Sequence, residues 1–556
     1  MNTLRRDLER TLITATEDLL STRPPVQPKM LPHLAPAAAL LWTGNCCTSG
    51  FIGDRKLLQY AGQMGDALAA ATRKEFVPQS NPPHLVPHAL ADALTLLEPQ
   101  LTSARRKRWR EVVRLAGTAL SQYLEAKRKQ LGRPGPYTGT GPNHLFRHAA
   151  TLYRIGRVLA NAQWSRQASA ALRRMVALQD PQTGCFPEQH GPVVAYHWVT
   201  LDGLARYLTS GGATFALEPL RRGIEYAVRH LYPDLVRLEL FDERNRLRRD
   251  EGAMFHPESC VYHPQGRRLL ALALQARPAM ASRLARATVG PRAGYALSEI
   301  ARALTVDFDE SQRAIPVESA RMTLRMDHAG LLRRRYGWFY GLSTLSAAAR
   351  PHHPFHMDRT ANIVLYHDRV GRVVAGGYDK ETLESATFRI IESGECGYFP
   401  AIASRLRSHS GCDRLHLDYG AAQARLEIRA ESAKRCRLTA TGSTNMRWRQ
   451  VDLNLQLWLP HGETIHLGAK RTRRVLRPRQ ATKSWPTNGV IELPGRYRIE
   501  TVGDAELIWP YRAYNVYGGP PHLMPPEEAV AILRVPLEPV RDRADVTFRL
   551  NQTAGL

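Results

Sequence analysis

Residues 303–320, ALTVDFDESQRAIPVESA, divide the sequence into two patterns. Before this stretch, apolar residues recur with a helical period in segments of about ten to twenty residues, separated by short Pro/Gly breaks. After it the period falls to two, and runs rich in β-branched and aromatic residues are bounded by Gly, Asp, Asn or Pro, which indicates strands. The sequence therefore predicts an all-helical part, a linker and an all-β part.

The clearest helical segment is HLFRHAATLYRIGRVLANA, which begins at His144. Its apolar residues lie on one face at helical spacing, whereas Arg147, Arg154 and Arg157 lie elsewhere. Several similar segments follow one another with loops of alternating length, and no strict repeat period relates them, so a solenoid is not indicated. This arrangement favours an α/α toroid, in which the loops at one rim form a cleft.

The second pattern consists of strands such as AQARLEIRAES and VDLNLQLWLP, joined by short turns without intervening helices. Such an order predicts an antiparallel β-sandwich. The predicted fold is α+β and multidomain: an N-terminal α/α toroid, expected as an incomplete barrel, followed by a C-terminal antiparallel β-sandwich. The predicted boundaries are 1–305 for the toroid, 306–318 for the linker and 319–556 for the sandwich.

The composition indicates an anionic partner. The 556 residues include 77 Lys plus Arg against 51 Asp plus Glu, a formal net charge of +26. Nucleic acid, an anionic membrane surface and an acidic polysaccharide all fit that charge. No zinc-finger spacing, RNP box or basic region leading into heptads is present, so we expect no nucleic acid as partner. With 43% hydrophobic and 23% charged residues, the sequence is not that of a disordered, collagenous or coiled-coil chain.

The cysteines and the N-terminus bear on the cellular compartment. The seven cysteines form neither a CxxC metal pattern nor a disulfide framework, which is typical of buried reduced thiols. The first twenty residues mix charges into a helical pattern, unlike a signal peptide, and no long apolar run could span a membrane. We therefore expect a cytoplasmic protein, or a secreted or periplasmic one whose leader was trimmed. The sequence does not indicate an oligomeric state.

Two polar stretches stand out in the helical part. In GPNHLFRHAATLYRIGR, Asn143 and His144 stand at a helix start after a Gly/Pro-rich loop, where Asn serves either as a helix cap or as a site residue. In DPQTGCFPEQHGPVVAYHWVTLDGLARY, a turn-rich loop leads to Tyr196 and His197 in the first turns of another helix. A tyrosine there is either a core aromatic residue or a functional one.

A third stretch, PHHPFHMDRTANIVLYH, opens a predicted strand. His352, His353, His356 and Asp358 precede that strand. By spacing alone, such a cluster could bind a metal, act as an acid or base, or cap a turn.

Together these stretches give the sequence a resemblance to the heparinase II/III-like polysaccharide lyases and their relatives among the alginate and oligoalginate lyases. Members of that family combine an α/α toroid with a β-sandwich, and carry an Asn and/or His in the toroid. About fifty residues later they have a loop of the form DG, aromatic, E and then a YH pair. The matching residues here are Gly184, Phe186, Glu188, Tyr196 and His197.

The sandwich of that family carries an HxHxD-like motif, and residues 353–358, HPFHMD, resemble a version with one extra residue. The extra residue leaves open whether His353 or His356 takes the catalytic position. Relatives with a metal in the sandwich have an Asp on the next strand, where this sequence has Gly376 and Gly377. We therefore predict no catalytic metal and no cofactor, with a structural metal in the sandwich as the alternative.

The resemblance implies cleavage of an acidic, uronate-containing polysaccharide by β-elimination, which leaves a 4,5-unsaturated uronate end. The C5 proton becomes acidic only when the neighbouring carboxylate is neutralised or hydrogen-bonded, a task suited to Asn143 with His144. Tyr196 suits the acid that protonates the departing O4, and it or one of His353 and His356 suits the base.

Further residues are predicted to bind the substrate. Arginine can hold a uronate through two parallel hydrogen bonds, and aromatic, histidine and carboxylate side chains complete the set. The predicted substrate-binding residues are Arg147, Glu188, His197, Tyr336, Tyr340 and Arg359.

Two other functions remain open from the sequence. A glycoside hydrolase of the α/α-toroid class, acting on uronyl oligosaccharides, would need two facing carboxylic acids, and Asp180, Glu188 and Asp202 surround the second stretch. A non-catalytic protein that binds acidic glycans would keep the fold and the charge. The identity of the polymer and the choice between endo and exo cleavage are not encoded in these motifs.

Overall fold

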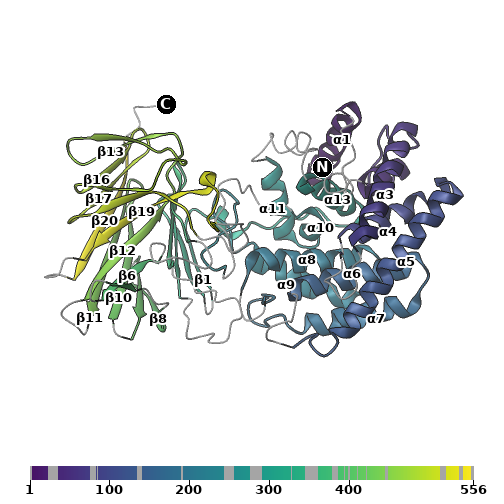
Figure 1. The fold of residues 1–556 in the computed structure, drawn as a ribbon, viewed down its shortest axis with the longest axis horizontal. Helices are drawn as coiled ribbons and strands as arrows, with labels where there is room; N and C mark the ends of the chain where they lie inside the picture. Colours follow the sequence, from purple (N-terminus) through teal and green to yellow (C-terminus); the bar gives the residue numbers. More distant parts are fainter. Residues whose placement is uncertain are drawn as a thin grey trace. The chain divides into compact units, whose positions relative to one another are not determined.

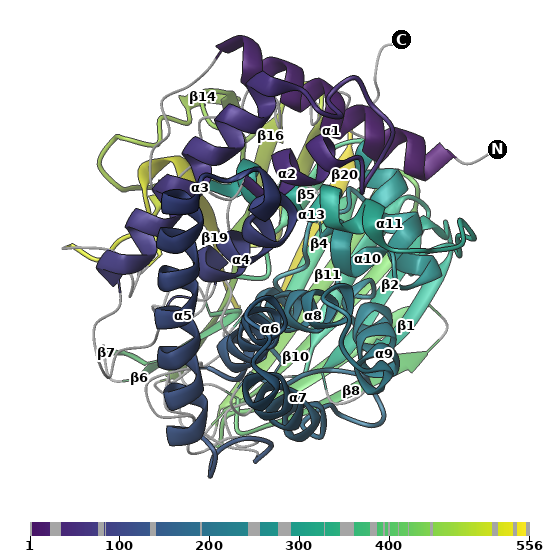
Figure 2. The same cartoon turned by 90° about the vertical axis from the view of Figure 1, so that its right-hand side faces the viewer.

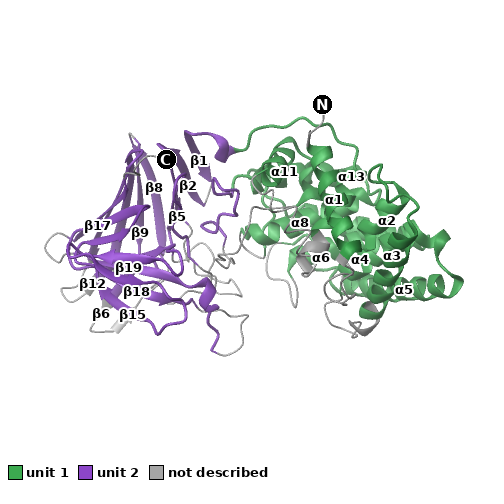
Figure 3. Ribbon diagram, turned by 90° about the horizontal axis from the view of Figure 1, so that it is seen from above, with its two compact units in different colours: residues 1–229, 253–315 green, residues 230–252, 316–556 purple. Residues whose placement is uncertain are grey.

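A computed structural model gives the fold. The residues that it describes are 3–22, 35–75, 83, 85–133, 141–188, 192–242, 256–275, 291–326, 329–344, 361–377, 386–392, 395–397, 401–409, 411–420, 422–444, 449–513, 521–537 and 542–551. They form two compact units, one of residues 1–229 and 253–315 and the other of residues 230–252 and 316–556 (Figure 3). The predicted boundaries at 305 and 319 stay a prediction of how the chain divides into domains.

The first unit is helical. Its helices are α1 (Thr3–Thr22), α2 (Ala35–Thr43), α3 (Arg55–Glu75), α4 (Leu85–Leu97), α5 (Ser103–Ala126), α6 (Pro142–Val158), α7 (Ala162–Val176), α8 (Val194–Thr209), α9 (Leu217–Ala227), α10 (Pro257–Cys260), α11 (Pro264–Gln275) and α13 (Pro291–Thr305). Short 3₁₀ turns occupy Glu98–Gln100 and Thr214–Ala216. None of the described helices is both long and apolar enough to cross a membrane.

These helices form an α/α toroid. Helices α2, α4, α6, α8, α10 and α13 pack against one another in that order, and α13 returns to α2, so they make an inner ring. Helices α3, α5, α7, α9, α11 and α1 surround them (Figure 2). Because α10 has only one turn, the inner ring is shorter at that helix than elsewhere, measured along the axis of the toroid. The predicted toroid is confirmed.

Inner and outer helices differ in how they are buried. The outer helix α5 buries one apolar stripe that includes Trp109 and Leu120, as an amphipathic helix should. The inner helix α6 is buried on nearly all sides. Its Arg147 and Arg154, which the periodicity placed away from the apolar face, donate to carboxylates inside the ring. An inner helix therefore has a polar face turned towards the centre of the toroid.

The second unit is an antiparallel β-sandwich. Its strands are β1 (Met322–Met326), β2 (Gly330–Arg335), β3 (Trp338–Ser343), β4 (Ile363–His367), β5 (Gly371–Val374), β6 (Phe388–Glu392), β7 (Glu395–Gly397), β8 (Ala403–His409), β9 (Cys412–Asp418), β10 (Ala422–Ser432), β11 (Arg435–Thr444), β12 (Arg449–Leu457), β13 (Thr464–Leu467), β14 (Thr472–Val475), β15 (Lys483–Pro486), β16 (Val490–Leu493), β17 (Tyr497–Thr501), β18 (Glu506–Tyr511), β19 (Val530–Pro536) and β20 (Arg543–Leu550). Pro316–Glu318 and Pro526–Glu528 form 3₁₀ turns.

The described strands form two sheets (Figure 1). One has the order β1-β2-β3-β4-β5-β12-β19-β18-β15, with β6 paired to β12 and β7 to β6. The other, called here the nine-stranded sheet, has the order β14-β13-β16-β17-β20-β11-β10-β9-β8. The pairs in both sheets are antiparallel, for example Leu426 opposite Ala440 and Leu365 opposite Tyr340. The predicted sandwich is confirmed.

The residues of the sandwich core are those that recur at every second position of a strand. In β10 the buried residues Ala422, Ala424, Leu426, Ile428 and Ala430 alternate with more exposed ones. The buried set joins residues of the other sheet in one continuous apolar core. The alternation that predicted the strands thus also decides which face of each sheet is buried.

Residues 230–242 precede the linker by some seventy positions, yet they pack on the sandwich. Leu240 lies against the backbone of Gly341 and Gly376, where added β-carbons would meet it at 2.7 and 3.1 Å. The backbone N–H of Gly376 donates to Glu239 Oε1 at 2.7 Å. The Tyr232 ring lies 5.8 Å from that of Phe339. Gly376 therefore has a packing role, because a side chain there would displace this segment.

Candidate functional site

The N-terminus of α6 is built from a Gly-Pro-Asn sequence. Gly141 is the N-cap residue, with an extended backbone, and Pro142 takes the first helical position, where its missing N–H costs nothing. Asn143 is therefore already inside the helix and is not its N-cap residue, although its Oδ1 accepts one N–H of the first turn. Gly141 offers no side chain to cap the helix.

The cap comes from a distant loop. The N–H of Asn143 donates to Glu188 Oε2 at 3.4 Å, and Glu188 is only 3% exposed. A β-carbon at Gly141 would stand 1.9 Å from Glu188 Oε1 and 2.7 Å from Asn143 Oδ1. Only glycine therefore leaves room for the carboxylate, whose negative charge also suits the positive end of the α6 dipole.

The side chain of Asn143 is buried and oriented. Its Oδ1 accepts the N–H of His144 at 2.7 Å. Its Nδ2 is buried, and no described residue accepts a hydrogen bond from it. A buried amide without an acceptor is costly, so this donor is a place where a ligand oxygen would gain a strong hydrogen bond.

Helices α6 and α8 are neighbours in the inner ring and run parallel. The backbone of Phe146, near the start of α6, lies against Gly203, past the middle of α8, and further along both helices the rings of Tyr153 and Tyr207 are 4.6 Å apart. The first turns of the two helices therefore lie at the same rim of the toroid (Figure 2). Asn143 and His144 are in one of these turns and Tyr196, half-buried, is in the other.

His197 lies beside Tyr196 but is buried. Its Nδ1 accepts the N–H of Phe186 at 3.1 Å, and its Nε2 is 2.8 Å from the carbonyl oxygen of Gly223, to which it donates. Burial lowers the pKa of His197 to about 4, against the opposing effect of these two backbone groups. The neutral imidazole thus ties the loop before α8 to α9.

Arg147 belongs to a buried ionic network. Its Nε donates to Asp202 Oδ2 at 2.7 Å, and Arg206 Nε donates to Asp202 Oδ1 at 2.8 Å. Arg302 donates to Glu258 at 2.7 Å and lies 3.8 Å from Asp92, which also accepts from Arg154. The members come from five inner helices, α4, α6, α8, α10 and α13.

The network sets the charge of several buried groups. Burial alone would raise the pKa of Asp92, but Arg154, His88 and Arg302 bring it below its usual value. Burial, only partly opposed by Arg302 and Arg206, raises the pKa of Glu258. The pKa of His88 falls to about 3 because of burial, which the nearby Asp92 opposes and the arginines reinforce.

Of the site residues predicted in the sandwich, the structure describes two, Tyr336 and Tyr340. Tyr340 is buried, and its Oη donates to Asp413 Oδ2 at 2.8 Å. Tyr336 is 39% exposed, has a positive φ of 57°, and its ring lies under the guanidinium of Arg335. The other predicted residues, His353, His356 and Arg359, lie outside the described residues.

Several residues of the ionic network, above all Asp92, Arg206 and Arg302, were not predicted from the sequence. The available signal was the spacing of Asp202 and Arg206, four residues apart on one helix. Its partners on other helices could not be read from spacing. Within the described residues, no cluster of His, Cys, Asp and Glu is arranged to hold a metal ion.

The fold resembles that of several polysaccharide-cleaving enzymes. A heparinase III with methylated lysines has a TM-score of 0.50 at 10% identity, covering 90% of this chain and 75% of that one. Heparinase III in another crystal structure gives 0.49 at 13% identity, with 90% and 74% covered. The chondroitin AC lyase of Streptomyces coelicolor A3, in complex with chondroitin sulphate, gives 0.47 at 13%, with 99% and 80% covered.

At 10% identity, the comparison that reaches a TM-score of 0.50 shows the fold alone: a toroid of helices followed by a β-sandwich. No family model matches the sequence, and no curated protein matches it.

Proposed function

We propose that the protein is a polysaccharide lyase that cleaves a uronic-acid-containing anionic polysaccharide by β-elimination, giving a 4,5-unsaturated uronate end. The observation that carries the proposal is the orientation of Asn143. Its oxygen is held by the N–H of His144, so its Nδ2 presents N–H donors that lack a described acceptor. A uronate carboxylate is the kind of group that such a donor would bind.

The electrostatics of the rim support this role. In the elimination, negative charge builds up on the uronate carboxylate as C5 loses its proton. An amide donor stabilises that charge without adding a charge of its own, and the positive ends of α6 and α8 favour it further. Arg147, only 13% exposed and bound to Asp202, is the predicted partner for a neighbouring uronate.

Proton transfer is assigned to the residues predicted from the sequence. Tyr196 protonates the departing O4, and the base is Tyr196 itself or one of His353 and His356. His144 assists Asn143 at the carboxylate. Arg359 and Tyr336 remain the predicted substrate-binding residues beyond the toroid.

Three other predicted substrate-binding residues have contacts that support positioning roles. Glu188 holds the start of α6, and with it the backbone of Asn143. His197 holds the loop before α8. Tyr340 bonds Asp413 inside the sandwich.

The contacts of the acidic residues favour a lyase over a glycoside hydrolase. A hydrolase needs two carboxyl groups facing the scissile bond. Asp202 is fully buried between two arginines, and Asp180 accepts the N–H groups of Gln182 and Thr183 in its own turn. Glu188 caps a helix, so each of the three acids already has a structural partner.

The experiment is a panel of acidic polymers, heparan sulfate, chondroitin sulfate, xanthan and alginate, incubated with the protein. A lyase produces a conjugated double bond that absorbs ultraviolet light, whereas a hydrolase produces reducing ends without that absorbance. Binding without either product would support the non-catalytic alternative and contradict the proposal.

A matched pair of variants tests the role of Asn143. Asn143→Ala should abolish most turnover and leave the protein folded. Asn161, the N-cap of α7, accepts the N–H of Trp164 at 3.1 Å, so Asn161→Ala should cost about 1 kcal/mol of stability and no activity. Equal activity in the two variants would remove Asn143 from the mechanism.

The net charge of +26 supports an anionic substrate. Apparent affinity for the polymer should therefore fall steeply as salt is added. The predicted exclusion of nucleic acid and the expected cellular compartment remain proposals.

A further inference from the structure

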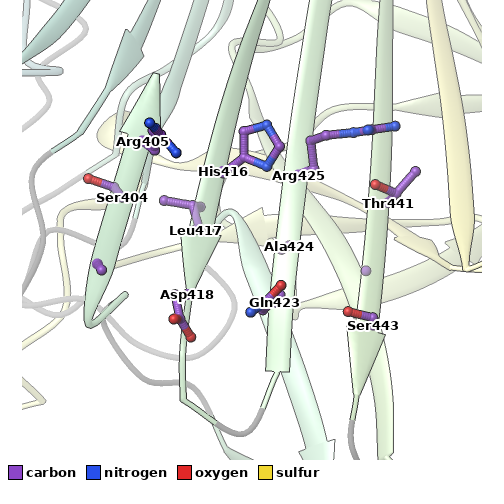
Figure 4. Close-up of a pocket in the computed structure, with 12 residues that line it drawn as sticks. Ser404, Arg405, His416, Leu417, Asp418, Gln423, Ala424, Arg425, Thr441 and Ser443 are labelled. Carbon is purple, nitrogen blue, oxygen red and sulfur yellow. The ribbon is translucent and has the colours of Figure 1, made fainter. Parts of the chain in front are cut away.

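A hollow lies on the nine-stranded sheet, on the face opposite the apolar core. Its volume is about 540 Å³. The side chains that point into it come from β8, β9, β10 and β11 and alternate with core residues such as Leu417 and Ala424 (Figure 4). The outward residues of the lining are Ala403, Arg405, His416, Asp418, Gln423, Arg425, Thr441 and Ser443.

Strand register places the cationic side chains of this hollow in one row. Arg405 stands opposite His416, His416 opposite Arg425, and Arg425 opposite Thr441 (Figure 4). Adjacent strands are about 4.8 Å apart, so the α-carbons of Arg405 and Arg425 lie about 10 Å apart across the sheet. That separation is comparable with the length of two linked sugar rings.

The positive charge of the row is only partly offset by described residues, since Glu427 interacts electrostatically with Arg425 but forms its ion pair with Arg414. Arg405 and Arg425 have no carboxylate within ion-pair distance among the described residues, and neither do Arg407 and Arg429 on the same face. Nearby arginines are paired instead: Arg414 binds Glu427 at 2.6 Å, and Arg437 and Arg543 share Asp545. The one acid in the lining, Asp418, accepts the N–H of Gly420 within its turn.

The pKa of His416 is affected by the same arginines. Its pKa is lowered first by partial burial and then by Arg425, Arg407, Arg405 and Arg414. The imidazole is therefore neutral at pH 7, and serves as a hydrogen-bonding group between two guanidinium groups.

We propose that this hollow is a second, non-catalytic site that binds a stretch of acidic polysaccharide. The arginines would hold carboxylate or sulfate groups, and Ser443, Thr441, Gln423 and Asp418 would bond the hydroxyls between them. Among the described residues, the lining contains no Phe, Tyr or Trp, the side chains on which a site for single-stranded nucleic acid would mainly stack bases. The chemistry of this ligand rests on the proposed function.

The test is a double variant of the full chain, Arg405→Ser with Arg425→Ser. Its control is Arg471→Ser with Arg496→Ser, which removes the same charge from the same sheet, where the arginines bind Glu492 and Glu463. Binding is measured on surfaces coated with heparan sulfate, chondroitin sulfate or xanthan, with Tyr196→Phe in every chain to limit cleavage. Single-stranded DNA of matched charge is the competing probe.

The double variant should bind at least one of the polysaccharides about tenfold more weakly, and the control should lose less than about twofold. Turnover of a short oligosaccharide, measured without Tyr196→Phe, should be unchanged. The proposed site would be contradicted if both variants lost affinity equally or if the double variant lost none. It would also be contradicted if the double variant lost more affinity for DNA than for polysaccharide. If no polymer yields an unsaturated product, the proposed function fails, while the binding comparison still tests the hollow.

Discussion

The centre of the toroid and the interior of the sandwich are built on opposite principles. Five inner helices meet at charged side chains, with Asp202 held between Arg147 and Arg206. The two sheets meet at apolar ones, such as Leu426 and Leu455. Buried acids do occur in the sandwich, but Asp413 and Asp452 are each bound by one arginine, Arg333 and Arg389 respectively.

The difference shows what each unit contributes. Burying paired charges costs desolvation energy that attraction between them repays only in part, so an ionic centre is a poor way to gain stability. An apolar core stabilises roughly in proportion to its buried area. The toroid therefore has an interior that costs desolvation energy beside the proposed site, whereas the apolar interior of the sandwich adds to stability.

The largest expected effect is a loss of turnover without a loss of stability, tested with two tyrosines of α8. Tyr196→Phe removes only a hydroxyl, and general acid catalysis typically contributes about a hundredfold to ten-thousandfold, so turnover should fall by at least about a hundredfold. Tyr207→Phe, at the other end of α8, removes a hydroxyl that donates to Ser169 at 2.9 Å and should keep activity. Initial rates and melting temperatures of both variants are the measurement. A Tyr196→Phe enzyme with more than about a tenth of wild-type turnover would return Tyr196 to the core-aromatic role.

The next effect concerns the ionic centre. Asp202→Ala leaves Arg147 and Arg206 buried without their shared carboxylate, and should cost about 3–5 kcal/mol of unfolding free energy in a urea titration. The triple change Arg147→Met, Asp202→Leu and Arg206→Met should instead keep or raise stability, and should lose activity. A triple variant that is both less stable and active would contradict our contrast between the units.

The sandwich should respond to lost volume. Leu426 is fully buried, so Leu426→Ala should cost about 2–5 kcal/mol through lost burial and the cavity left behind. Turnover at saturating polymer should stay near wild type at temperatures where the variant is folded. A loss in turnover as large as that of Tyr196→Phe would mean that the sandwich core takes part in the site.

The smallest effect is a dependence of toroid stability on pH. His88 and His197 have folded pKa values of about 3 and about 4, below the ordinary 6.5. Because the folded values are depressed, the stabilising contribution is present above pH 6.5 and is lost as pH falls towards the folded values. At pH 5 each histidine should cost about 2 kcal/mol relative to neutral pH.

Urea titrations of the wild type and of His197→Gln at pH 7.5 and 5 measure this effect. The variant should lose less stability on acidification than the wild type. An equal loss in both would show that His197 is protonated in the folded protein.

The sequence predicted what periodicity encodes. The alternation in β10 and the helical spacing in α6 were enough for the fold, because burial of one face is a local pattern repeated along an element. Asn143 and Tyr196 could be proposed because each was expected at a helix start after a turn-rich loop, and that position is confirmed for both. The contact of Glu188 with the N–H of Asn143 and the ion pair of Asp92 with Arg154 could not be predicted, since both are made only through tertiary packing.

The segment 230–242 carries a practical consequence for anyone who wishes to make either unit alone. The chain passes between the units three times, after residues 229, 252 and 315. A gene fragment starting at Pro316 would encode the sheets without Tyr232, Glu239 and Leu240, and would expose the faces of Phe339 and Tyr366 that Tyr232 covers. A single cut at the linker would fail in the same way, so a separately made sandwich needs the segment 230–242 supplied with it.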